Sequence, residues 1–233
     1  MKKQTIIVTG ASSVIGKEIA RQFLKNGDNV VINALTAEKL TQVFRELGEG
    51  ENLAMVAGNA SNRVTGIKLL ATAVGRFGSA DVLVNNAGFF ETRPFLNVDE
   101  AYFDQFLDTN LKGAFFTTQG VIPQMLKQGN GVVINIGTPL VSCTPGGVPT
   151  TALLASKGAI HSLTIQLAAE FGKHNVRFNT IALGTALPPM LGDMVNWSAG
   201  LHSLNCPGQV EDIAKMVYTV AKSNFITGTI IAT

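Results

Sequence analysis

A glycine-containing turn near the start of the chain has the residues and the spacing to bind a diphosphate. Residues 9–16 read Thr-Gly-Ala-Ser-Ser-Val-Ile-Gly, directly after an apolar run and at the start of a helical pattern. Backbone N–H groups at a helix start, aided by the helix dipole, attract phosphate. Gly10 permits the tight turn, and Gly16 permits close packing of the helix on a sheet. Either hydroxyl of Ser12 and Ser13 can donate to phosphate, so this turn predicts dinucleotide binding.

The histidines and cysteines of the sequence do not indicate a metal site or a disulfide bond. His161, His174 and His202 lie far apart without ligand-like spacing, and Cys143 and Cys206 are isolated. We therefore expect no metal site. The two cysteines are expected to be small core or surface residues in a reducing compartment.

Strand-like and helix-like segments alternate along almost the whole chain. The predicted strands are residues 5–9, 29–33, 53–57, 81–85, 131–136, 176–181 and 228–232. The predicted helices are residues 14–26, 36–47, 64–77, 98–126, 151–171 and 209–221. Strands that are apolar on both faces and separated by helices require a parallel sheet covered on two sides. We predict a single α/β domain over residues 1–233, a doubly wound parallel sheet (Rossmann fold) of about seven strands with helices on both faces.

One long loop, residues 184–207, interrupts this alternation. Such a loop within a compact domain is usually functional or mobile, although a loosely packed connection is the alternative. Met190, Leu191, Met194 and Trp197 indicate an apolar lining, or an ordinary packed lid.

Several motifs resemble those of the short-chain dehydrogenase/reductases and occur in that family's order. The turn resembles Thr-Gly-x-x-x-Gly-x-Gly, with Val14 in place of the middle glycine, and residues 85–88 match Asn-Asn-Ala-Gly. Residues 156–159 match the segment that carries the catalytic lysine. Residues 176–184 resemble the strand and turn that close over the nicotinamide, with leucine at 183 instead of proline. The terminal portion resembles bacterial β-ketoacyl-carrier-protein reductases.

The resemblance implies NAD(H) or NADP(H) as cofactor and a set of residues that hold it. That set is Gly10, Ser12, Ser13, Ile15, Gly16, Ala34, Leu35, Asn59, Ala60, Asn86, Ala87, Gly88, Lys157 and Gly184. NAD-preferring members carry an aspartate where this chain has Ala34, so nothing repels the 2′-phosphate of NADP. Lys17 or Lys39 is a candidate to attract it, although both are expected to be solvated surface lysines. We therefore favour NADP(H) slightly over NAD(H).

The resemblance also implies a catalytic group that has lost one member. In the family, a tyrosine four residues before the lysine transfers the proton, and here that position is Leu153. Lys157, Asn110, Thr138 and Ser142 are the remaining candidates: Lys157 for the cofactor ribose, and Thr138 or Ser142 for polarising a carbonyl. Asn110 holds a relay water in the family, or it bridges helices structurally. Thr150 lacks an adjacent base and is a poor substitute acid, while Tyr102 and Tyr218 belong to other helices.

Two functions remain open on this basis. The first is an oxidoreductase that transfers hydride between nicotinamide and a small carbonyl or hydroxyl substrate, with impaired or altered proton transfer because of Leu153. The second is a non-catalytic NAD(P)-binding protein with a redox-sensing, regulatory or assembly role.

The composition of the chain limits the kinds of molecule that it is expected to bind. The chain has 233 residues, of which 46% are hydrophobic and 15% charged, with a net charge of +2. This charge is too small to argue for nucleic acid or a charged membrane surface, and no apolar run reaches the ~18–20 residues that span a bilayer. We expect a cytoplasmic protein and a small apolar carbonyl or alcohol as substrate. The apolar balance and the resemblance predict a homodimer or homotetramer, with Phe115, Phe116, Ala152 and Leu163 as candidate contacts.

Overall fold

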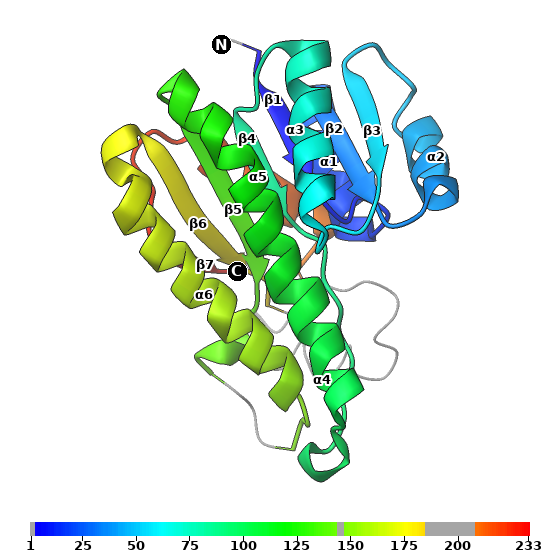
Figure 1. Ribbon diagram of the computed structural model, residues 1–233, viewed down its shortest axis with the longest axis vertical. Helices are drawn as coiled ribbons and strands as arrows, with labels where there is room; N and C mark the ends of the chain where they lie inside the picture. The colour runs from blue at the N-terminus through cyan, green and yellow to red at the C-terminus, as the bar shows by residue number, and fades with distance from the viewer. Residues whose placement is uncertain (1–2, 144–146, 185–207) are drawn as a thin grey trace.

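A seven-stranded parallel sheet forms the centre of the computed structural model, which describes residues 3–143, 147–184 and 208–233. The strand order is β3-β2-β1-β4-β5-β6-β7, as predicted for a doubly wound sheet. The strands are β1 (Thr5–Val8), β2 (Asn29–Ala34), β3 (Leu53–Ala57), β4 (Val82–Asn85), β5 (Gly131–Gly137), β6 (Val176–Ala182) and β7 (Thr229–Ala232). Figure 1 shows them side by side behind the helices of one face.

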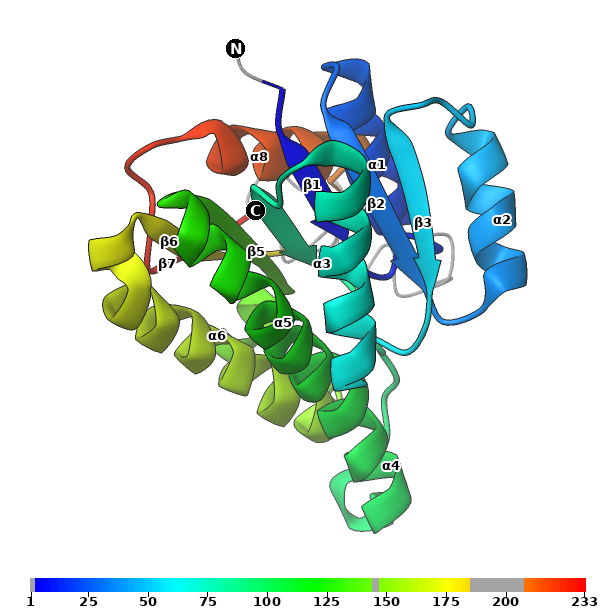
Figure 2. The ribbon, with the colours of Figure 1, turned by 45° about the horizontal axis from the view of Figure 1, so that its top comes forward.

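Helices cover both faces of the sheet (Figures 1 and 2). They are α1 (Val14–Lys25), α2 (Ala37–Glu46), α3 (Arg63–Phe77), α4 (Glu100–Phe106), α5 (Gly113–Gln128), α6 (Thr151–Phe171) and α8 (Val210–Lys222). Apolar residues of α1, α2 and α8 form one buried cluster with the sheet, and those of α3, α5 and α6 form another. The sheet is thus buried on both sides, which explains its continuous apolar strands. No helix of the described residues is long and apolar enough to cross a bilayer.

The strand order reverses at β1, which pairs with β2 on one side and β4 on the other. At such a switch point, the loops that follow the two central strands diverge and leave a crevice at the carboxyl edge of the sheet. The loop after β1 contains Gly10, and the loop after β4 contains Asn86 to Gly88. The fold therefore brings the predicted phosphate turn and the Asn-Asn-Ala-Gly motif to the same edge.

The predicted helix over residues 98–126 is continuous but contains one wider turn. Residues Leu107–Lys112 form a π-helix between α4 and α5. Asn110 lies within this π-helix and is buried. Such turns are frequent at functional sites, and α4 continues from this one beyond the edge of the sheet (Figure 1).

A chain of buried polar side chains crosses the sheet under α5 and α6. The amide of Asn85 donates to Asn135 Oδ1 at 2.9 Å, and the amide of Asn135 donates to Thr164 Oγ1 at 2.9 Å. The hydroxyls of Thr164 and Thr180 lie 2.8 Å apart. Asn85 faces Asn135 in the strand register, and Asn135 faces Thr180. Each of these buried groups therefore has the partner that burial requires.

The long loop is the one predicted feature that mostly falls outside the described residues. Of residues 184–207, the structure describes Gly184 alone. Its backbone N–H donates to the carbonyl oxygen of Thr233 at 3.0 Å.

Candidate active site

The turn after β1 needs glycine at both ends because the loop after β4 lies against it. Gly10 has φ +65°, and a Cβ there would lie 2.6 Å from Ala87 Cα. A Cβ on Gly16 would lie 2.5 Å from Asn86 Nδ2. Both distances are shorter than real contacts, so the close approach of the two loops accounts for both glycines.

Of the two serines in the turn, Ser13 is the one that caps a helix. Ser13 caps α1: its Oγ accepts from Gly16 N at 3.0 Å and from Asn86 Nδ2 at 3.2 Å. Ser12 is exposed. Ser13 is exposed as well, and because its Oγ only accepts in these bonds, the hydroxyls of both serines remain candidate donors to a phosphate. Val14, at the position of the middle glycine of the fingerprint, begins α1 and is 44% exposed.

Residues predicted for the adenosine end lie at the carboxyl ends of β2 and β3. Ala34 is buried and Leu35 is 68% exposed, while Ala60 is buried beside the exposed Asn59. Asn59 Oδ1 accepts from the backbone N–H and the hydroxyl of Ser61, which leaves its amide N–H groups for a ligand.

One of the two lysines considered for a 2′-phosphate is already engaged. Lys17 forms an ion pair with Glu46. Lys39 is exposed. These observations do not assign Lys17 or Lys39 to the 2′-phosphate of NADP.

Lys157 lies between the ends of β4 and β5. Its Nζ donates to the carbonyl oxygen of Ile136 at 2.7 Å and lies 3.5 Å from the position a Cβ would take on the exposed Gly88. Among the described residues Lys157 forms no ion pair. Burial of the ammonium lowers the pKa of Lys157 to about 8, because the bond to one carbonyl oxygen does not make up for the hydration that the cation loses.

Both the oxygen and the nitrogen of the Asn110 side-chain amide form hydrogen bonds, and these bonds join three segments. Its Oδ1 accepts from Phe89 N at 2.7 Å, and its Nδ2 donates to Phe89 O at 3.2 Å and to Ser156 Oγ at 2.9 Å. These bonds tie the π-helix to the loop after β4 and to α6. They favour the structural interpretation of Asn110 that the sequence left open.

Three hydroxyl residues lie around the start of α6 and the end of β5. Thr138 follows β5 directly, is half-buried, and its Oγ1 accepts from Leu140 N at 3.4 Å. Ser142 is exposed at the end of the short 3-10 helix Pro139–Val141. Thr150 is buried, and its hydroxyl lies 3.5 Å from the carbonyl oxygen of Val148. Thr138 is therefore the hydroxyl nearest in the chain to the carbonyl that holds Lys157.

Known proteins similar to this chain are dehydrogenases and reductases. The family model for short chain dehydrogenases matches residues 4–199. An L-rhamnose-1-dehydrogenase of Scheffersomyces stipitis is 37% identical, covering 97% of this chain and 92% of its own. A 3-oxoacyl-[acyl-carrier-protein] reductase of Staphylococcus epidermidis is 33% identical, covering 97% and 95%. The chain belongs to the short-chain dehydrogenase family. A structure from Sinorhizobium meliloti assigned as a short-chain alcohol dehydrogenase superposes with a TM-score of 0.90 at 29% identity, covering 100% of this chain and 95% of its own.

This short-chain dehydrogenase carries an apolar cluster where the family resemblance places its tyrosine. Leu153 is 3% exposed and is buried in a cluster with Tyr102, Phe106 and Ala152, against which Phe89 packs. The cluster lies between α4 and the start of α6. A leucine buried in this way offers no proton and no hydrogen bond.

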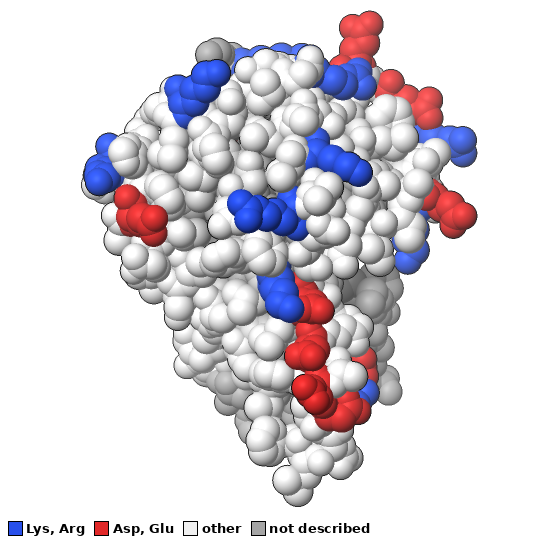
Figure 3. All heavy atoms as spheres, viewed as in Figure 1, with Lys and Arg blue, Asp and Glu red and all other residues white. Residues whose placement is uncertain are grey.

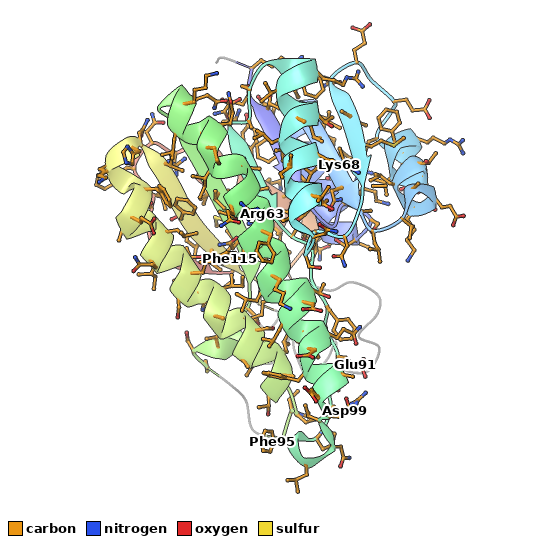
Figure 4. The ribbon with its side chains drawn as sticks, in the orientation of Figure 1. Arg63, Lys68, Glu91, Phe95, Asp99 and Phe115 are labelled. Carbon is orange, nitrogen blue, oxygen red and sulfur yellow. The ribbon has the colours of Figure 1, made fainter. Side chains whose placement is uncertain are left out.

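Tyr102 enters the same cluster from α4, which is a different helix from α6, as predicted. Its hydroxyl has no hydrogen-bond partner among the described residues. The guanidinium of Arg93 lies 3.7 Å from the centroid of its ring, and burial raises the pKa of Tyr102. Arg93 also pairs with Glu91 and Asp99, which Figure 4 labels near α4. Tyr102 is thus packed under this charged group at the α4 end.

His161 is a site residue that the sequence interpretation missed. It lies four residues after Lys157 on α6 and is buried, and its Nε2 has no partner among the described residues. That atom lies 2.7 Å from the position a Cβ would take on Gly137, the residue after Ile136. Burial and the charge of Lys157 both lower the pKa of His161. The i, i+4 spacing from Lys157 was the available signal, but the histidines were considered only as metal ligands.

Proposed function

We propose that this short-chain dehydrogenase binds NAD(H) or NADP(H) and transfers hydride between the nicotinamide and a small carbonyl or hydroxyl compound. Its proton transfer does not use a side chain at position 153. One observation supports the proposal: the loop from Asn86 to Gly88 packs against the glycine turn on one side, and Lys157 Nζ lies beside Gly88 on the other. A turn suited to diphosphate and a lysine suited to a ribose hydroxyl therefore share one crevice.

The residues present fit a dinucleotide along this crevice. The first-turn N–H groups of α1 that Ser13 does not cap lack intrahelical acceptors, and the exposed hydroxyl of Ser12 adds a donor. Asn59 offers amide N–H groups toward an adenine. The bound cofactor supplies or accepts the hydride. Thr138 polarises the carbonyl oxygen, and Lys157 orients the ribose.

A missing acid lowers the rate without abolishing the reaction. Removal of one positioned proton donor typically costs about 10²–10⁴-fold. Positioning of the reactants and the remaining dipoles still accelerate the step, with water as the proton source. We therefore expect slow turnover of ordinary ketones, and faster turnover of a substrate that carries its own acidic group.

A second function, cofactor binding without catalysis, is favoured by two observations. Leu153 is packed inside an apolar cluster, and an exposed valine, Val14, occupies the position of the fingerprint's middle glycine at the start of α1. In that case the dinucleotide stabilises the fold, reports redox state or supports assembly with an active relative.

Cofactor titration is the first test. Fluorescence of NADH and NADPH on addition of protein should show binding, with NADPH slightly tighter because no carboxylate follows β2. Ser12→Ala should weaken binding while the unfolding free energy stays unchanged. Ser13→Ala should also lower stability by about 1 kcal/mol, because it removes an N-cap. Failure of both coenzymes to bind at near-millimolar concentration would end the proposal.

Turnover by wild type and by Leu153→Tyr separates the two functions. The panel should include small ketones and alcohols, L-rhamnose and a 3-oxoacyl thioester. Slow wild-type turnover that rises in Leu153→Tyr supports the oxidoreductase; turnover in the variant alone supports the non-catalytic function. Leu154→Tyr is the matched control, since it places the same phenol one residue further along α6.

We further propose a homodimer or homotetramer formed through α5 and α6. Phe115 is 42% exposed, and it lines a groove with Phe116 and Leu163 from the neighbouring helix. Charged side chains are sparse over these helices (Figures 3 and 4). Ala152, the fourth predicted contact, is instead buried beside Leu153. Light scattering should give a mass above one chain, and Phe115→Asp should lower it.

A further inference from the structure

An exposed aromatic side chain lies beside the crevice and has no role in the hydride transfer proposed above. Phe90 is 47% exposed. It follows Gly88 by two residues, so the Cα atoms of the two lie at most about 7.6 Å apart. The position that a Cβ would take on Gly88 lies 3.5 Å from Lys157 Nζ. Phe90 is therefore close to the lysine that orients the cofactor ribose, at the carboxyl edge of the sheet.

The loop after β4 gives two adjacent phenylalanines different surroundings. The backbone N–H and carbonyl oxygen of Phe89 bond to the side-chain amide of Asn110 at 2.7 and 3.2 Å. The ring of Phe89 packs against that of Phe106, with their centroids 4.8 Å apart. Phe89 is thus held against the protein, whereas Phe90 remains exposed and can contact a ligand.

The loop after β5, residues 138–150, also borders the crevice and contains no charged residue. Its first residue is Thr138, which polarises the carbonyl in the proposed reaction. Further along the loop, Val141 Cγ1 lies 3.7 Å from the position that a Cβ would take on Gly158, the residue after Lys157. This loop therefore brings an apolar side chain to the part of α6 that carries the lysine.

The cation of the loop after β4 is already engaged. Arg93 is the one lysine or arginine in residues 86–99. It forms ion pairs with Glu91 at 3.7 Å and with Asp99 at 3.3 Å, and its guanidinium lies 3.7 Å from the centroid of the Tyr102 ring. Next to Phe90, this loop therefore offers a substrate an aromatic surface rather than an unpaired cation.

From this arrangement we propose that Phe90 contacts the substrate and selects neutral carbonyl compounds with a flat apolar ring, namely aryl ketones and the matching alcohols. The ring of such a substrate packs on Phe90, as aromatic pairs favour, while its oxygen lies toward Thr138. A polyhydroxylated sugar would lose hydration of its hydroxyls at these apolar surfaces without gaining hydrogen bonds there. The inference deepens the proposed function, because it rests on the same crevice.

Ligand binding to the full chain tests the selectivity without requiring turnover. Acetophenone and L-rhamnose are titrated separately, with and without NADP⁺, and ligand-observed NMR gives each dissociation constant. We expect acetophenone to bind at least about tenfold more tightly than L-rhamnose, because only the ketone buries an apolar ring. Equal affinities, absence of acetophenone binding, or tighter binding of L-rhamnose would overturn the proposal.

Variants of phenylalanine test the residue itself. Phe90→Ala should weaken acetophenone binding about tenfold, because the ring contact and its apolar area are both lost. Phe90→Tyr keeps the ring and should stay within about twofold of wild type. Phe95→Ala is the matched control and should leave the affinity unchanged, since Phe95 is 69% exposed near α4, away from the sheet (Figure 4). Equal affinities in Phe90→Ala and Phe95→Ala would overturn the role of Phe90.

The same titrations separate this inference from the proposed function. Acetophenone binding that depends on Phe90, in a protein that binds neither coenzyme, would leave the inference standing and refute the oxidoreductase. Cofactor-dependent oxidation of L-rhamnose that Phe90→Ala does not change would refute the inference and leave the oxidoreductase standing.

Discussion

Replacement of Lys157 by methionine should stabilise the ligand-free protein at neutral pH. The ammonium is desolvated in the fold, and its pKa falls from 10.5 to about 8. Each pKa unit corresponds to about 1.4 kcal/mol, so the buried charge costs up to ~3.4 kcal/mol, an upper bound for a partly exposed residue. Lys157→Met removes this cost and also the bond to Ile136 O, which contributes about 1 kcal/mol. The net expectation is a gain of about 2 kcal/mol at pH 7.

The pH dependence gives this prediction its sign. Below the folded pKa, both states hold the proton and the full penalty is present. As pH rises from 8 toward 10.5, the unfolded chain binds more protons than the folded one, so the wild type gains stability. The advantage of Lys157→Met should therefore vanish near pH 10.

Urea unfolding at pH 7 and pH 10 measures both quantities. Lys127→Met, at an exposed position of α5, is the control and should change stability by less than about 0.5 kcal/mol at either pH. A difference between Lys157→Met and wild type that does not change with pH would refute the reasoning. So would a variant less stable than wild type at pH 7.

Two further predictions concern the scaffold of the site and of the sheet. Gly10→Ala should abolish cofactor binding and cost at least about 1 kcal/mol, because its φ is +65° and its Cβ would meet Ala87; an unchanged affinity by fluorescence titration would contradict this. Lys222→Met should cost about 3 kcal/mol in urea unfolding, because the buried carboxylate of Asp28 would lose the ammonium 2.8 Å away. A loss below about 1 kcal/mol would show that water replaces that partner.

The fold was predictable from the sequence because its strands are buried on both faces. A short, mostly apolar run such as residues 131–136 has one interpretation when helical patterns flank it, and the seven predicted strands all occur in the sheet. The π-helix around Asn110 was not predictable. It depends on the bonds that Asn110 makes to Phe89 and Ser156, which lie far away in the sequence.

The candidate site was only partly predictable for the same reason. Motif spacing placed Gly10, Asn86 and Lys157 at one edge, because loops after neighbouring parallel strands must meet there. Side-chain partners across the fold could not be read in this way. The cap that Ser13 makes on α1 and the packing of Tyr102 in one cluster with Leu153 depend on such contacts, which motif spacing does not show.

The row of asparagine and threonine side chains beneath α5 and α6 has a consequence for how the chain folds. Asn85 donates to Asn135, and Thr164 bonds to both Asn135 and Thr180, only when the three strands are aligned as they are. A slip of one residue would point an amide at the opposite face of the sheet, among apolar side chains. Each stranded group would cost about 1–3 kcal/mol. Strands β4, β5 and β6 thus contain buried polar side chains that specify their register. These side chains disfavour mispaired sheets during folding.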